Sequence, residues 1–164
     1  MPEAQLFTWA DRYSYPSEAE IEKRIAPLAR ARGYLQRHEF LEMCRWKTPR
    51  SQPRCEANSE EFVRDVTRTA FGTRNEELKI RVLLLLQGVS WPTASVILHF
   101  CDEQRYPILD VRALWSVGLR RVPTYTFSLW WQYTCFIRGI GDRTGLSMRA
   151  IDRALWQYSK ERQP

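Results

Sequence analysis

The chain has 164 residues, 44% of them hydrophobic, with seven each of Trp, Tyr and Phe, so it can bury a substantial core and is not a disordered protein. Its formal net charge is +6, and only four of its 25 basic residues are Lys. Because the planar guanidinium of Arg suits bidentate contact with phosphate, this composition favours an anionic partner. Arg residues on solvated helix faces would give the same composition, so charge supports this interpretation without deciding it.

Targeting and metal-binding patterns are not found in the sequence. The N-terminus lacks the basic and apolar regions of a signal peptide, and no apolar run approaches the roughly 18 residues of a membrane helix, so we expect a cytoplasmic monomer without a membrane partner. Cys44, Cys55, Cys101 and Cys135 are widely spaced and form no C-x-x-C pair. The spacing predicts reduced thiols, mostly in or near the core, and neither zinc nor an iron–sulfur cluster.

Helix start signals recur along the first half of the chain. Ser17, with Glu20 at the capping-box spacing, predicts a first long helix. A shorter helix is predicted over residues 38–47, and the two prolines of residues 48–59 predict a loop there. Asn58 or Ser59 then begins a helix over residues 60–71.

The pattern in that helix predicts a buried stripe of Phe62, Val66 and Ala70. Asn75 begins the next helix, which we expect to run through the leucines at 83–86 and to be the central buried element.

The second half continues as helices. Pro92 begins a helix through Phe100, and the few residues around Gly88 join it to the preceding helix as a tight hairpin. A short helix is predicted to begin near Asp110, an aromatic helix to cover residues 126–140, and Ser147 to begin the last helix. The fold class predicted is therefore all-α, a compact helical bundle or barrel in one domain over residues 1–164.

The most specific pattern is LLLLQGVSWPTASVIL, residues 83–98, followed by Asp110 in YPILDVRALW. It resembles the helix-hairpin-helix motif of the endonuclease III, or HhH-GPD, superfamily of DNA glycosylases, here over about residues 76–102. The positions that match that motif are Leu86, Gly88, Val89, Thr93 and Ala94. An ordinary helix end at Gly88 and an ordinary helix start at Pro92 are the alternative interpretation of the same residues.

The resemblance implies binding of double-stranded DNA in the nucleoid through the hairpin. In such a hairpin, glycine permits close approach of the backbone and the second helix directs N–H groups at a phosphate. The matching DNA contacts would be Gly88, Val89, Ser90, Trp91 and Thr93, with Arg112 nearby. The family also holds a monovalent cation, K⁺ or Na⁺, on hairpin carbonyls, which would here be those of Leu84, Leu86 and Val89.

Two positions depart from the family pattern. Ser90 stands where the second glycine usually lies, so the turn must form with a side chain present. Pro92 stands at the position of the lysine that forms a Schiff base in bifunctional members, and proline has no amine. A lyase that uses this position is therefore excluded, and a displaced nucleophile such as Lys47 is a minor alternative.

The resemblance also implies base excision, with Asp110 as the catalytic residue. In the family this carboxylate faces the sugar of a flipped nucleotide and stabilises oxocarbenium-like charge. We therefore expect a compact, monofunctional DNA glycosylase that acts in DNA repair or on modified foreign DNA, without an iron–sulfur cluster. Capping of the helix after it is the alternative role of Asp110. Candidate base-pocket residues are Trp46, Lys47, Tyr106, Asp152 and Gln157.

Two other functions fit the same sequence. One is a non-catalytic helix-hairpin-helix module that binds duplex DNA without opening the base stack. The other is a helical protein-interaction domain with dispersed Arg residues. The salt dependence of DNA affinity discriminates the last from the first two, because neutralisation of phosphates releases counterions.

Overall fold

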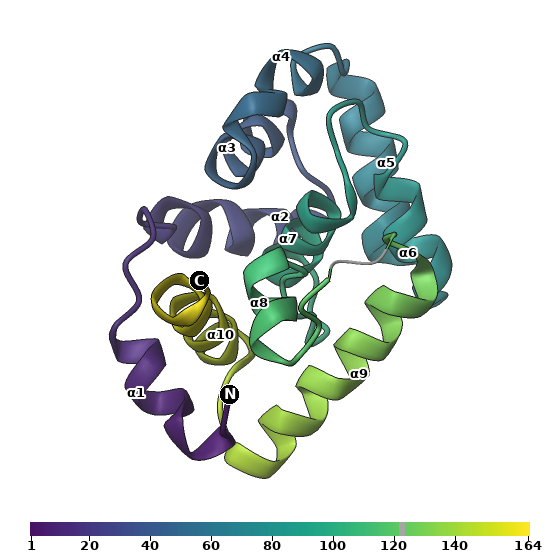
Figure 1. Cartoon of the computed structure of the whole chain (residues 1–164). Coiled ribbons are helices and arrows are strands. Elements are labelled where there is room, and N and C mark those ends of the chain that lie inside the picture. Colours follow the sequence, from purple (N-terminus) through teal and green to yellow (C-terminus); the bar gives the residue numbers. More distant parts are fainter. Residues whose placement is uncertain (122–123) are drawn as a thin grey trace. The chain divides into compact units, whose positions relative to one another are not determined.

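The computed structural model describes residues 1–121 and 124–164, which are helical and contain no strand, as the sequence predicts (Figure 1). The chain divides into two compact units, one formed by Met1–Tyr15 with Arg105–Pro164 and the other by Pro16–Gln104. We call them unit 1 and unit 2. That both units belong to one domain over residues 1–164 stays a prediction. None of the described helices is both long and apolar enough to cross a bilayer.

Unit 2 is built around a helix that is buried on nearly every side, α7 (Trp91–Cys101). The other helices of the unit share short connections and pack their apolar faces around it or against one another. They are a π-helical turn η2 (Ile21–Ile25), α2 (Ala26–Arg32), α3 (Arg37–Lys47), a 3-10 turn η3 (Pro49–Ser51), α4 (Gln52–Cys55), α5 (Glu60–Gly72) and α6 (Glu76–Leu83). Ala94, Ile97 and Leu98 are fully buried, so α7 is the core element of this unit.

Unit 1 brings together the two ends of the chain. A 3-10 turn, η1 (Glu3–Gln5), leads into α1 (Leu6–Asp11), and α8 (Val111–Ser116), α9 (Phe127–Thr144) and α10 (Met148–Arg162) follow much later in sequence. The C-terminal helix α10 packs against both α1 and α8. Its apolar face, which includes Ile151, Ala154 and Leu155, is buried there. The sequence analysis did not predict α1, which is short and begins without a side-chain cap.

Several predicted helix starts are confirmed by side-chain caps. Ser59, Asn75 and Ser147 each accept a hydrogen bond from the backbone N–H three residues later. Asp110 caps α8 in the same role, through the N–H of Arg112. These local hydrogen bonds satisfy N–H groups that a helix leaves unpaired at its first turn, and therefore fix where each helix begins.

Some local predictions were wrong. Residues 48–59 are not a continuous loop, because prolines fit the first turn of a helix and Pro49 and Pro53 begin η3 and α4. Phe62 is 41% exposed, and Val63 takes its place in the buried stripe of α5. At the capping box predicted for Ser17 and Glu20, the Ser17 hydroxyl accepts the N–H of Ala19 and the carboxylate of Glu20 pairs with Arg24.

The leucine run was also interpreted incorrectly. Helix α6 ends at Leu83, and the next three residues continue as turns. Leu83 and Leu86 are buried, whereas Leu85 is 61% exposed. The central buried element is therefore α7, because Leu84, Leu85 and Leu86 lie in the turn that precedes it.

Candidate functional site

The turn between α6 and α7 is tight and has defined backbone hydrogen bonds. The N–H of Val89 donates to the carbonyl of Leu86 at 3.1 Å, and Gly88 between them has a φ of +81°. Ser90 is extended, and its carbonyl accepts from Ala94 N–H at 2.8 Å to begin α7. The structure therefore places left-handed backbone, which glycine adopts without strain, at the position where the sequence has Gly88.

Residues at the end of α4 and just after it pack against this turn. A Cβ added to Gly88 would lie 2.6 Å from Cys55 Sγ and 2.9 Å from Cys55 N, so glycine is required for space as well as for conformation. The side chain of Asn58 is buried and forms hydrogen bonds with both the N–H and the carbonyl of Gln87, each 2.9 Å long. Sequence analysis missed this role and considered Asn58 only as a helix cap.

The predicted DNA contacts of unit 2 differ in accessibility. Ser90 is exposed, and Gly88, Val89 and Trp91 are partly exposed. Thr93 is 1% exposed, so its hydroxyl lies inside the unit and we leave it out of the proposed contacts.

Basic side chains flank the same turn. The guanidinium of Arg81 lies 5.9 Å from the centre of the Trp91 ring and also pairs with Glu77 at 2.7 Å. Arg54 is exposed, and its Cβ would lie 3.1 Å from a Cβ added to Gly88. Sequence analysis missed both, because Arg54 lies outside the segment of the resemblance and Arg81, although inside it, is not one of the matched positions. Their charges would favour a phosphate near the turn.

The backbone of the turn is compatible with a monovalent cation. The carbonyl of Leu86 accepts one hydrogen bond and keeps a second lone pair, while those of Leu84 and Val89 accept none among the non-helical backbone bonds of the described residues. Carbonyl oxygens are suitable ligands for a hard cation. In the described part of the chain, no cluster of three His, Cys, Asp or Glu side chains is arranged for a metal.

In unit 1, Asp110 lies at the N-cap of α8 and is partly exposed. Its Oδ1 accepts the backbone N–H of Arg112 at 2.8 Å, which fixes the carboxylate at the start of the helix. Two tyrosines lie close enough for this carboxylate to affect their titration. Burial, with the charge of Asp110 as a smaller cause, raises the pKa of Tyr125, and burial raises that of Tyr133 further, with Asp152 and Asp110 adding to it.

These tyrosines stay neutral around Asp110. The hydroxyl of Tyr133 donates to the carbonyl of Ile108 at 3.3 Å. The hydroxyl of Tyr125 is buried and has no hydrogen-bond partner among the described residues. Asp110 therefore has neutral phenols near it, and sequence analysis missed both because they lie beyond the matched segment.

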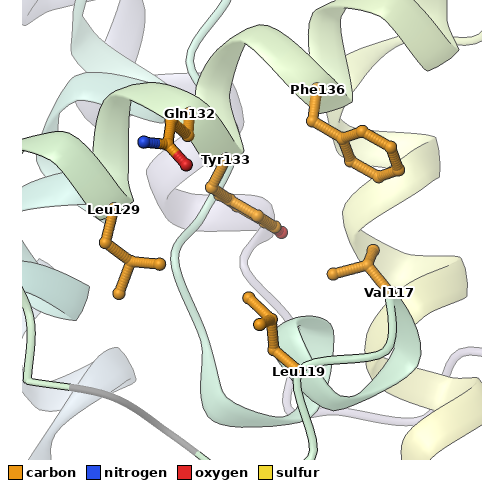
Figure 2. Close-up of a pocket in the computed structure, with 6 residues that line it drawn as sticks. All are labelled: Val117, Leu119, Leu129, Gln132, Tyr133 and Phe136. Carbon is orange, nitrogen blue, oxygen red and sulfur yellow. The ribbon is translucent and has the colours of Figure 1, made fainter.

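A pocket of about 190 Å³ opens in unit 1 beside one of these tyrosines (Figure 2). Figure 2 shows Leu129, Tyr133 and Phe136 projecting from α9 toward Val117 and Leu119, which follow the last residues of α8. The lining is largely apolar, so the pocket itself supplies no acid or base besides the Tyr133 phenol.

The predicted base-pocket residues are divided between the two units. Trp46 and Lys47 lie in unit 2 and are partly exposed, and the indole of Trp46 donates to the carbonyl of Pro16 at 3.1 Å. In unit 1, Tyr106 is 1% exposed and stacks on the buried ring of Trp130. Tyr106 is therefore a core residue of its unit.

The two pocket candidates on α10 are also buried. Asp152 forms an ion pair with Arg149, and the side-chain oxygen of Gln157 accepts from both Ser14 N–H and Ser14 hydroxyl. These side chains hold neighbouring residues of unit 1 in position. Neither directs its hydrogen-bonding groups into the pocket of Figure 2, whose lining does not include them.

Comparisons of the chain with protein-family models, with curated proteins and with solved structures gave no match. The resemblance to DNA glycosylases therefore rests on the residues around the α6–α7 turn and on Asp110.

Proposed function

We propose that the protein is a monofunctional DNA glycosylase. The observation that carries the proposal is Asp110, a partly exposed carboxylate that a backbone N–H holds at the start of α8. Residues 102–109 connect it to α7, so this aspartate comes shortly after the second helix of the hairpin, as the resemblance implies. A fixed carboxylate beside neutral phenols suits stabilisation of positive charge on a sugar.

Duplex DNA would be held by the turn between α6 and α7. Backbone N–H groups at the start of α7 and the charges of Arg54 and Arg81 would meet the phosphates, and these contacts carry no base specificity. A potassium or sodium ion on the carbonyls of Leu84, Leu86 and Val89 would add positive charge beside a phosphate.

The reaction follows from the chemistry of one carboxylate. As the glycosidic bond of a flipped nucleotide breaks, its electron pair leaves with the base, and Asp110 stabilises the positive charge on the sugar. Water then adds to the anomeric carbon, and the proton that it loses passes through Asp110 to the departing base, which leaves an abasic site. Pro92 has no amine, so this position forms no Schiff base and strand cleavage does not follow.

The test compares the wild-type protein with Asp110→Asn on duplexes that carry a panel of damaged or modified bases. Alkali then cleaves the abasic sites. Asparagine also caps helices, so the variant should fold while losing about 100-fold or more of its activity. The matched control is Asp11→Asn, which changes an exposed aspartate of the same unit and should behave as wild type.

A second candidate is a DNA-binding module without catalysis. It is favoured by the hydrogen bond between Asp110 and Arg112 N–H, because capping alone would account for this aspartate. It predicts that neither wild type nor Asp110→Asn yields breaks on any duplex, while both bind DNA equally and with a steep salt dependence.

A further inference from the structure

Three aromatic rings of unit 1 form a cluster at the end of the N-terminal segment. Trp156 of α10 lies 5.6 Å from Tyr13 and 5.2 Å from Tyr15 between ring centres, and the two tyrosines are 6.4 Å apart. All three side chains are partly exposed, and Ser14 between the tyrosines is exposed. We call these three residues the ring cluster.

Cations lie over two of these rings. Arg112 and Lys160 lie 5.5 Å and 5.3 Å from the centre of the Trp156 ring. Arg149 and Arg153 lie 5.1 Å and 5.6 Å from the centre of the Tyr13 ring. Arg112 comes from α8 and the other three cations come from α10, and all four lie over rings of the same cluster.

The cluster is held by polar contacts to α10. Gln157 binds the backbone and side chain of Ser14, Lys160 donates to the Ser14 hydroxyl at 2.9 Å, and Arg149 donates to the Tyr13 hydroxyl at 3.1 Å. The carboxylate of Asp152, which pairs with Arg149, is buried. Two of the predicted base-pocket residues, Asp152 and Gln157, therefore position this surface.

We infer that the ring cluster and its cations form a binding site for single-stranded nucleic acid. Partly exposed aromatic rings can stack unpaired bases, and the convergent cations can neutralise the phosphates between them. The charges of Arg112 and Lys160 beside the Trp156 ring would complement the phosphates of a polyanion. A base that itself carries positive charge would be disfavoured there. The inference does not depend on glycosylase activity, although Arg112 donates its N–H to Asp110.

The test measures fluorescence anisotropy of a labelled, undamaged oligothymidylate of about ten nucleotides, a length within the range of single-strand sites. Trp156→Leu should bind about 10-fold more weakly, whereas Trp156→Phe, which keeps an aromatic ring, should stay within about 3-fold of wild type. The double variant Arg153→Gln with Lys160→Gln should lower the slope of log affinity against log salt by about 1.4, or about 0.7 for each cation.

The matched control is Trp131→Leu. Trp131 is also a partly exposed tryptophan of unit 1 with an arginine over its ring, Arg138 at 5.5 Å, but it lies on α9 outside the ring cluster. It should bind the oligonucleotide as wild type does, and circular dichroism checks that each variant is folded. Equal binding by folded Trp156→Leu and wild type overturns the inference, as does equally effective competition by inorganic polyphosphate, which has no bases. These outcomes are independent of abasic-site formation, so they are distinguishable from failure of the proposed function.

Discussion

The side-chain amide of Asn58 forms hydrogen bonds with both backbone polar groups of Gln87, 29 residues later in the chain. The same amide donates to the carbonyl of Cys55 at 2.9 Å. The residue before Gly88 is thus fixed by a buried side chain, and the α6–α7 turn is attached to the end of α4.

Asn58→Ala should destabilise the protein by about 2–4 kcal/mol, because it leaves the part-buried N–H and carbonyl of Gln87 without their side-chain partner. Urea denaturation measures the change. Asn75→Ala is the control, because it removes only an exposed helix cap and should cost about 1 kcal/mol. Equal losses of stability in the two variants would show that the hydrogen bonds from Asn58 to Gln87 contribute no more than an ordinary helix cap.

Comparing Gly88→Ala with Gly33→Ala distinguishes the cost of left-handed backbone from the cost of a steric clash. Both glycines have φ near +80°, but nothing lies within 4 Å of a Cβ at Gly33, whereas Cys55 would meet one at Gly88. Gly33→Ala should cost about 1–2 kcal/mol from left-handed backbone alone. Gly88→Ala should lower the free energy of unfolding clearly more in the same denaturation experiment, and it should also weaken DNA binding. A loss of stability no greater than that of Gly33→Ala would contradict the predicted clash with Cys55.

The ion pair between Lys79 and Asp102 is almost fully buried, with 2.5 Å between Nζ and Oδ2. Replacing one partner, as in Lys79→Met, leaves a buried charge and should cost about 3–5 kcal/mol of unfolding free energy. Glu77→Ala breaks the exposed pair with Arg81 on the same helix and should change stability by less than about 0.5 kcal/mol. Similar small changes in both variants would mean that Asp102 is adequately solvated or otherwise compensated.

Alkaline pH should destabilise unit 2 through its buried thiols. Burial raises the pKa of Cys101 to about 12, from 9.0, and also raises that of Cys44. Between pH 9 and about pH 12 the unfolded chain releases the Cys101 proton and the folded chain keeps it. The free energy of unfolding therefore falls as pH rises, by up to about 1.4 kcal/mol per pH unit.

Denaturation of wild type and Cys101→Ala at several pH values above 9 measures this effect. The variant should lose less stability per pH unit than wild type. Cys135→Ala, which changes the exposed cysteine, should keep the wild-type slope. Equal slopes for all three proteins would contradict a raised pKa at Cys101.

The sequence by itself determined the helical fold class and most helix starts. Asn75, Asp110 and Ser147 could be recognised as caps because each bonds to an N–H two or three residues later, and such interactions require no knowledge of the rest of the chain. Glycine at position 88 similarly indicated a turn, which the structure forms there with positive φ.

Tertiary structure decided which side chains are accessible and which residues meet. It buried Thr93 and Tyr106, exposed Leu85, and brought Ser14 to Gln157, 143 residues away. Helical periodicity identifies an apolar face, but neighbouring helices determine how much of that face is covered, and contacts of long sequence separation depend on how all the helices pack. For this reason the sequence indicated Asp110 and the α6–α7 turn. The hydrogen bonds from Asn58 to Gln87 and the ring cluster with its cations could be found only in the folded chain.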